Sequence, residues 1–340
     1  MNRALLLTGV VCVLSLAAGA GCLGDAPHDN PFDPDSERFV REGGVSGLVT
    51  DRAGSPLPEA EVRLIPGSAG TQPELVTRTD SRGEYEITGA AEGSGYRLLV
   101  GKDGYETEML EALDIEAGLV EELPVQRLNA LPVLVDASFR TLHISRWWPT
   151  NDLFFLEVSA TVSDTDGLLD IEQVWFEIPA QGYTTTLNAL VQPAGQFEKR
   201  IRADSLPTGS LQPLLGETLR LRVRDRDGSV VTSDAGQLVR VLDGTPNTIS
   251  PLTDGVIGTN RPTLIWEPFP PLFPFTYRVE VYRDEISPPV LVRQFDNIPM
   301  DVTSLQVDVS LPTAEYFWTV TVVDAFGNQS RSKQAGFAVP

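Results

Sequence analysis

Short runs in which apolar and polar residues alternate recur along most of the chain, and turn-forming residues separate them. The runs VSGLVTD at 45–51 and AEVRLI at 60–65 flank a segment rich in glycine and proline. The run LRLRVRD at 219–225 alternates three apolar residues with three arginines. A period of two predicts strands that bury one face and leave the other in water. We therefore predict an all-β fold.

These strands group into three successive modules, at residues 44–128, 129–245 and 246–340. Within the modules, short glycine-containing turns connect the alternating runs, as at the Asp-Gly pairs 103–104 and 166–167. Turns of this kind join neighbouring antiparallel strands. We predict three tandem antiparallel β-sandwiches.

The first 43 residues depart from this pattern. Met1-Asn2-Arg3 precedes a largely apolar stretch at 4–20 that ends in small residues. One positive charge, an apolar core and small residues at its end are the three parts of an export signal. We predict a signal peptide at 1–21. A retained transmembrane helix, which needs about 20 apolar residues, is the alternative.

Cys12 and Cys22 are the only cysteines, so Cys22 would stand unpaired at the new N-terminus after cleavage. The segment GAGC at 19–22 resembles the lipobox of bacterial lipoproteins, although glycine stands first where leucine is usual. The resemblance implies an acylated Cys22 and, because Leu23 rather than aspartate follows it, an outer-membrane location. The acidic, proline-containing residues 22–43 are predicted to form a flexible tether.

Each module resembles a known domain family. The first is similar to the carboxypeptidase regulatory-like, transthyretin-type sandwich, and the second to a bacterial immunoglobulin-like sandwich. The third resembles a fibronectin type III domain, with Trp266 as its core tryptophan. The first resemblance rests on turn and core positions: Gly47, Val49, Asp51, Gly54, Pro56, Leu57, Ala60, Val62, Leu64, Thr79, Asp80, Gly83, Tyr85, Gly104 and Tyr105. These resemblances imply architecture and no catalytic chemistry.

Acidic turns in the second module are candidate metal ligands. The sequence DTDG at 164–167 is followed by a further aspartate and is echoed by DRDG at 225–228. Calcium prefers several closely spaced carboxylate and carbonyl oxygens. We predict a calcium site at Asp164, Asp166 and Asp170. Hairpin turns that bind no metal are the alternative.

Two aromatic segments are candidates for binding a partner. The segment 267–277 contains four prolines and three phenylalanines, Phe269, Phe273 and Phe275. It predicts either a rigid loop folded over the end of a sandwich or an exposed apolar patch that binds a protein. Trp147 and Trp148 are expected either to stack on a sugar ring or to fill a core or module junction.

Charge and motifs exclude several functions. The net charge of −21 disfavours nucleic-acid binding, because a phosphate backbone needs a concentrated basic face. The sequence contains no HExxH, GxSxG or P-loop motif, and we expect no enzymatic activity.

The sequence therefore predicts a non-catalytic lipoprotein of the cell envelope, held on the outer membrane by acyl chains on Cys22. Its β-sandwich modules would serve protein–protein contact or a structural or adhesive role, toward an envelope or extracellular protein or a glycan. A carbohydrate-binding surface lipoprotein and a calcium-stiffened spacer are the alternatives.

Overall fold

The computed structural model describes residues 36, 41–67, 72–233, 236–252, 255–270, 272–285 and 288–340. Nearly all regular structure in these ranges is β, which confirms the predicted fold class. The helices of these ranges are short 3₁₀ turns: η1 (Leu168–Asp170), η2 (Pro179–Gln181), η3 (Ala203–Ser205) and η4 (Gln212–Leu214). None of these described helices has the length and apolar character needed to cross a membrane.

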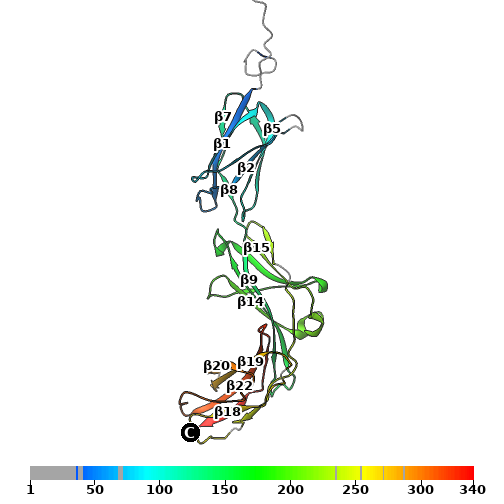
Figure 1. Ribbon diagram of the computed structural model, residues 1–340, viewed down its shortest axis with the longest axis vertical. Helices are drawn as coiled ribbons and strands as arrows, with labels where there is room; N and C mark the ends of the chain where they lie inside the picture. Colours follow the sequence, from blue (N-terminus) through cyan, green and yellow to red (C-terminus); the bar gives the residue numbers. More distant parts are fainter. Residues whose placement is uncertain are drawn as a thin grey trace, which may run out of the picture.

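Three separate hydrophobic cores divide the described chain into three sandwiches. In Figure 1 the sandwiches follow one another along the long axis, with the first at the top and the C-terminus at the bottom. Buried residues alternate with exposed ones along the central strands, because one face of each sheet packs against the opposite sheet.

Module 1 packs two sheets around one core. The first sheet contains β1 (Glu42–Asp51), β4 (Glu84–Ala91), β7 (Val120–Glu122) and β8 (Gln126–Leu128). The second contains β2 (Glu61–Ile65), β3 (Leu75–Arg78), β5 (Gly93–Gly101) and β6 (Glu108–Ile115). Gly47 lies opposite Tyr85 in the β1–β4 pair, and a Cβ at Gly47 would lie 2.7 Å from the Tyr85 hydroxyl. The glycine therefore leaves room for the tyrosine ring.

Module 2 has the same two-layer plan. One layer contains β9 (Val133–Ile144), β10 (Leu153–Ser163), β13 (Asn188–Ala189) and β14 (Gln196–Arg202). The other contains β11 (Ile171–Ile178), β12 (Tyr183–Thr186), β15 (Arg220–Asp225) and β16 (Val230–Thr232). Leu221 and Val223 of β15 are fully buried, whereas the arginines between them are partly exposed on the outer face.

Module 3 surrounds a core that contains Trp266 and Trp318, whose ring centroids lie 6.4 Å apart. A small sheet contains β17 (Thr248–Ser250), β18 (Thr263–Trp266) and β21 (Ser304–Gln306). The larger layer contains β19 (Phe275–Arg283), β20 (Val290–Pro299), β22 (Ala314–Asp324), β23 (Gln329–Arg331) and β24 (Ala335–Val339).

One sheet crosses the boundary between modules 2 and 3. β23 pairs in parallel with the last residues of β9, with Ser330 opposite His143 and Arg331 opposite Ile144. The Ser145 N–H continues this ladder by donating to the Arg331 carbonyl at 3.0 Å. The β9 layer of module 2 and the β22 layer of module 3 therefore form a single nine-stranded sheet.

Candidate functional site

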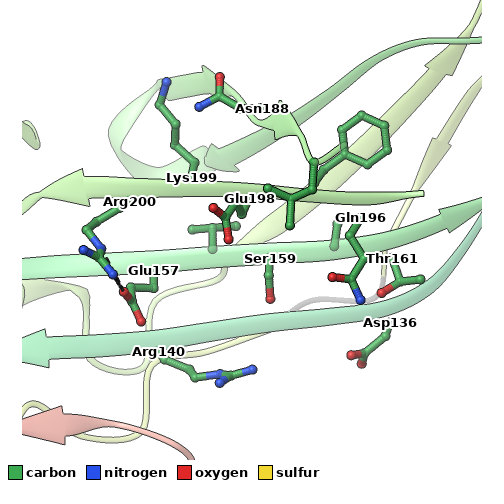
Figure 2. Close-up of a pocket in the computed structure, with 14 residues that line it drawn as sticks. Asp136, Arg140, Glu157, Ser159, Thr161, Asn188, Gln196, Glu198, Lys199 and Arg200 are labelled. Carbon is green, nitrogen blue, oxygen red and sulfur yellow. Dashed lines mark hydrogen bonds and ion pairs between the residues drawn. The ribbon is translucent and has the colours of Figure 1, made fainter. Parts of the chain in front are cut away.

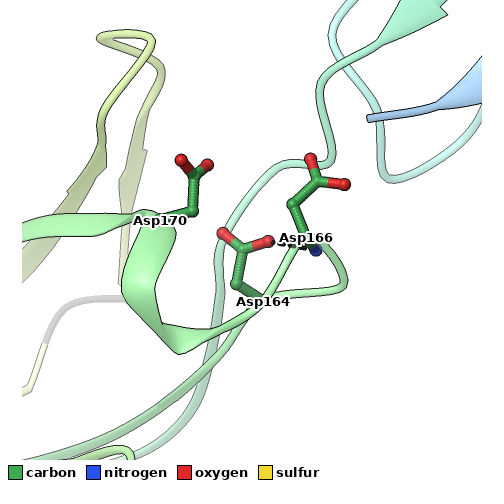
Figure 3. Close-up of side chains that lie close together, drawn as sticks. All are labelled: Asp164, Asp166 and Asp170. Carbon is green, nitrogen blue, oxygen red and sulfur yellow. Dashed lines mark hydrogen bonds between the residues drawn. The ribbon is translucent and has the colours of Figure 1, made fainter. Parts of the chain in front are cut away.

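The three aspartates predicted as a calcium site come together at the end of module 2 that faces module 1. Asp164 and Asp166 project from the turn after β10, and Asp170 ends η1 (Figure 3). One carboxylate oxygen from each lies within 4.8 Å of the others. The turn reverses through Gly167, whose φ of 105° favours glycine over residues with a side chain.

Local hydrogen bonds hold two of these carboxylates by one oxygen each. Asp164 Oδ1 accepts from the Asp166 N–H at 2.8 Å, and Asp166 Oδ2 accepts from the Ala130 N–H at 2.8 Å. Asp164 Oδ2, Asp166 Oδ1 and Asp170 Oδ2 are buried and accept no hydrogen bond. Burial raises the pKa of Asp164 against the opposing effect of the Asp166 N–H, and neighbouring carboxylates raise it further. Negative charge is therefore concentrated here.

The linker between modules 1 and 2 is fixed on both sides of this cluster. The Asn129 carbonyl accepts from the Glu106 N–H at 2.8 Å, while Asn129 Nδ2 donates to Asp225 Oδ2 at 2.8 Å. The Ser229 hydroxyl donates to Glu106 Oε2 at 2.8 Å. Arg52, just after β1, contacts the Asp227 carboxylate. Both modules therefore hold the linker by polar contacts.

The second Asp-x-Asp-Gly turn has different chemistry. Asp225 is fully buried, and its Oδ1 accepts from the Asp227 N–H at 3.1 Å and the Ser229 N–H at 2.8 Å. Its Oδ2 accepts from the Asn129 amide. Donors therefore use both oxygens of this carboxylate, as in a hydrogen-bonded Asx turn.

A second polar network joins modules 2 and 3. Asp324 is 4% exposed, and its Oδ2 accepts from Arg240 Nη1 at 2.8 Å and from Asn328 Nδ2 at 3.1 Å. Asn328 Oδ1 in turn accepts from the Thr141 N–H of β9 at 2.9 Å. These contacts tie the turn between β22 and β23 to module 2.

His143 is a second buried polar group at this junction. Its Nδ1 lies 3.0 Å from the Leu242 carbonyl and its Nε2 lies 3.0 Å from Asp152 Oδ2. The imidazole also stacks on Phe154 with ring centroids 4.1 Å apart. Nothing in the local sequence around His143 indicates a junction, because Leu242 lies about a hundred residues away in the chain.

The two tryptophans differ in their surroundings. Trp147 Nε1 donates to the Gln334 carbonyl of module 3 at 2.6 Å, and Lys333 Nζ lies 4.5 Å from the Trp147 ring centroid. Trp148 is 83% exposed. Trp147 therefore has the contacts of a junction residue, one of the two alternatives from the sequence. Trp148 presents its ring to solvent.

The three phenylalanines of the proline-rich segment point into module 3. Phe275 is 6% exposed and packs edge-on against Tyr277, with ring centroids 5.1 Å apart. Phe269 and Phe273 are partly buried against the same core, and the Arg240 guanidinium lies 4.1 Å from the Phe273 ring centroid. These are the contacts of a loop folded over the sandwich end. The partner-binding role of these phenylalanines stays a prediction.

A shallow polar groove of about 750 Å³ runs over β9, β10, β13 and β14 in module 2 (Figure 2). Oppositely charged side chains pair within it, as where Arg200 Nη2 lies 2.6 Å from Glu157 Oε1. Paired charges of this kind are typical of the solvated face of a sheet.

The predicted lipidation site Cys22, the signal peptide and most of the tether lie outside the described residues. Their assignment stays a prediction from the sequence.

Comparison with known proteins gives the family of the first module. Residues 44–127 match the family model of the carboxypeptidase regulatory-like domain, as predicted from the sequence. No curated protein sequence matches the chain.

The chain also matches solved structures, all at low sequence identity. BcpA, the major pilin subunit of Bacillus cereus, is 11% identical, with a TM-score of 0.31 over 85% of this chain and 91% of that chain. The chicken CNTN1 FN1-FN3 domains are 10% identical, with a TM-score of 0.31 over 82% and 90%. A tetra-tandem repeat in the extending region of a large adhesion protein is 15% identical, with a TM-score of 0.20 over 86% and 74%. These likenesses concern the fold alone.

Proposed function

We propose that the protein is a non-catalytic lipoprotein of the cell envelope whose three sandwiches form a stiff rod, anchored in the outer membrane by acyl chains on Cys22. The rod presents its modules to an envelope or extracellular protein, in a structural or adhesive role. The observation that carries this proposal is the sheet that continues from module 2 into module 3.

A shared sheet stiffens a pair of modules in a way that a peptide linker does not. Bending between modules 2 and 3 would break the β9–β23 backbone pairing. It would also separate Asp324 from Arg240, and a buried carboxylate that loses its partner costs several kcal/mol. Modules 2 and 3 therefore move as one body.

Stiffness gives the rod its reach. The predicted tether, which ends where β1 begins at Glu42, would span roughly 25 Å by random-coil scaling. The three sandwiches extend in line beyond it (Figure 1). An anchor at Cys22 would thus hold module 3 at the far end, away from the membrane surface.

Expression in a Gram-negative host tests the anchor. We expect the wild-type N-terminal peptide to carry acyl chains on Cys22 and the protein to fractionate with the outer membrane. Cys22→Ala should lose both properties, because the thiol is the acylated group, whereas Cys12→Ala should keep both. An unmodified wild-type N-terminus would contradict the proposed lipid anchor at Cys22.

Glycan binding is the second candidate, and Trp148 is the observation that favours it. The loop that carries Trp148 also contributes Arg146, Asn151 and Asp152 to a cavity of about 360 Å³. An exposed ring beside polar groups suits a sugar, which stacks its apolar face on the ring and bonds through its hydroxyls. Glycan-array signal that disappears in Trp148→Ala but persists in Val191→Ala, another exposed apolar residue, would support this candidate.

A further inference from the structure

Buried polar atoms without a hydrogen-bond partner are concentrated between modules 1 and 2. Among the residues that the structure describes, eleven side-chain nitrogen or oxygen atoms are buried and have no hydrogen-bond partner. Four of them lie at this junction: Asn129 Oδ1, Asp164 Oδ2, Asp166 Oδ1 and Asp170 Oδ2. Such atoms are uncommon because each has lost its bonds to water, so a group of four requires a physical explanation.

The charges at this junction are strongly unbalanced. Five aspartates belong to the two turns: Asp164, Asp166, Asp170, Asp225 and Asp227. Within the described ranges, Arg52 is the basic side chain that pairs with them. Its Nη1 lies 3.8 Å from Asp170 Oδ1, whereas Asp170 Oδ2 is the oxygen without a hydrogen-bond partner. One guanidinium therefore pairs with two of the five carboxylates and leaves the three oxygens of the cluster without a hydrogen-bond partner.

Asn129 provides an observation that is independent of the aspartates. Its side chain is only 7% exposed and lies between the two turns, because its amide donates to Asp225 while the next residue donates to Asp166. Its Oδ1 is buried there without a donor. A metal cation would satisfy all four oxygens together, because each of them can act only as an acceptor or a ligand when no donor faces it.

We propose that Asp164, Asp166, Asp170 and Asn129 bind one calcium ion in the junction between modules 1 and 2. Calcium binds oxygens at about 2.3–2.6 Å, so opposite ligands lie up to about 5 Å apart. One carboxylate oxygen from each of the three aspartates lies within 4.8 Å of the others, which satisfies that limit. Water completes the six to eight ligands that calcium takes.

Calcium fits this site better than magnesium does. Magnesium requires a near-ideal octahedron at about 2.0–2.1 Å and usually keeps several waters with one or two carboxylates. Here three carboxylates come together from a turn and the end of a 3₁₀ helix, and the proposed fourth ligand comes from the linker. Calcium tolerates such an irregular set of ligands.

The ion would fix the linker between modules 1 and 2. Asn129 belongs to this linker and its carbonyl accepts from the Glu106 N–H of module 1, while the Ala130 N–H beside it already holds Asp166. Arg52 of module 1 contacts Asp170, so its positive charge opposes the ion. Calcium would therefore order the linker and compete with Arg52 for Asp170. The inference deepens the proposed rod, on which its biological meaning rests, and is independent of the acylation of Cys22.

Isothermal titration of the full mature chain in detergent with calcium chloride tests the site. We expect one calcium ion per chain, with a dissociation constant at or below about 1 mM, the upper range of extracellular calcium modules. Asp166→Asn and Asp170→Asn should each weaken binding at least tenfold. Asp301→Asn, an exposed change of the same charge in module 3, should leave it unchanged. Arg52→Gln should tighten binding severalfold by removing a competing cation.

Terbium luminescence locates the ion between the modules. The Tyr105 backbone bridges to Ala130, and burial together with the charge of the Asp166 carboxylate raises the pKa of the Tyr105 hydroxyl, so the ring should sensitise a bound terbium ion. Tyr105→Phe should dim the emission while calcium still displaces terbium at the wild-type concentration. Unchanged emission would place the ion elsewhere and overturn the proposal.

Two further outcomes would also overturn the proposal. The first is that the wild-type chain does not bind calcium. The second is that Asp166→Asn and Asp170→Asn both bind calcium as tightly as the wild-type chain does, while near-ultraviolet circular dichroism shows that they are folded. If the chain does not bind calcium, the expected fractionation with the outer membrane is unaffected. If Cys22 is not acylated, the expected calcium binding is unaffected, so the two proposals can be rejected separately.

Discussion

Asp164 and Asp225 each begin an Asp-x-Asp-Gly turn, but they have opposite surroundings. Asp225 accepts hydrogen bonds from two backbone N–H groups and from Asn129. Asp164 accepts one, from the Asp166 N–H, and burial together with nearby carboxylates raises its pKa. Without a bound cation, the ionised form of Asp164 therefore opposes folding, whereas Asp225 holds three donors in place.

This contrast predicts opposite effects of two substitutions in EDTA. Asp164→Asn should raise the free energy of unfolding by about 1 kcal/mol, because an amide keeps the bond to Asp166 and donates to an unpaired oxygen. Asp225→Ala should lower it by about 2 kcal/mol or more, because three donors lose their acceptor. Urea unfolding measures both values. Equal losses in the two variants would show that the turns are equivalent.

The sequence predicted part of this site. Asp164, Asp166 and Asp170 lie within seven residues of one another, so a local motif brought them together. Asn129 and Arg52 could not be predicted, because they reach the cluster only when module 1 docks on module 2. Local spacing says nothing about such distant contacts.

At the scale of elements, alternation predicted the strands well because each buries one face against its own module. The proline-rich segment left two alternatives, since prolines and phenylalanines suit either a cap or a patch. Because the Phe275 ring packs on Tyr277 inside module 3, we expect Phe275 to stabilise the module.

Phe275→Ser should therefore lower the free energy of unfolding by about 3 kcal/mol or more, because it removes a buried ring from the module 3 core. Leu272→Ser, in the same loop, should change it little, because Leu272 is 85% exposed. Thermal unfolding of both variants provides the comparison. A stable Phe275→Ser protein would mean that the Phe275 ring does not contribute to the module 3 core.

The turn between β22 and β23 couples two modules through Asp324. Asp324→Asn should lower the free energy of unfolding by about 3 kcal/mol, because the Arg240 charge loses its buried partner. Calorimetry should then show the single transition of modules 2 and 3 dividing into two. Asp308→Asn, which breaks an exposed pair with Arg293, should leave that transition whole. A divided transition in the wild-type protein would contradict the coupling.

At the scale of the whole molecule, the junctions decide the shape. The sequence divided the chain into modules because turns and alternation are local signals. It could not show that β9 pairs with β23, because their partners Ser330 and His143 are 187 residues apart. Two separate polar networks, one at each junction, favour a rod over modules on loose linkers.

Small-angle X-ray scattering of residues 41–340 in millimolar calcium tests the rod most directly. A rigid rod predicts a pair-distance distribution with a peak at the width of a single sandwich and a long linear tail. The single conformation of Figure 1 should be enough to fit the scattering profile. EDTA should shorten the tail by loosening the first junction alone. A profile in calcium that only a broad ensemble of bent shapes can fit would contradict the rod.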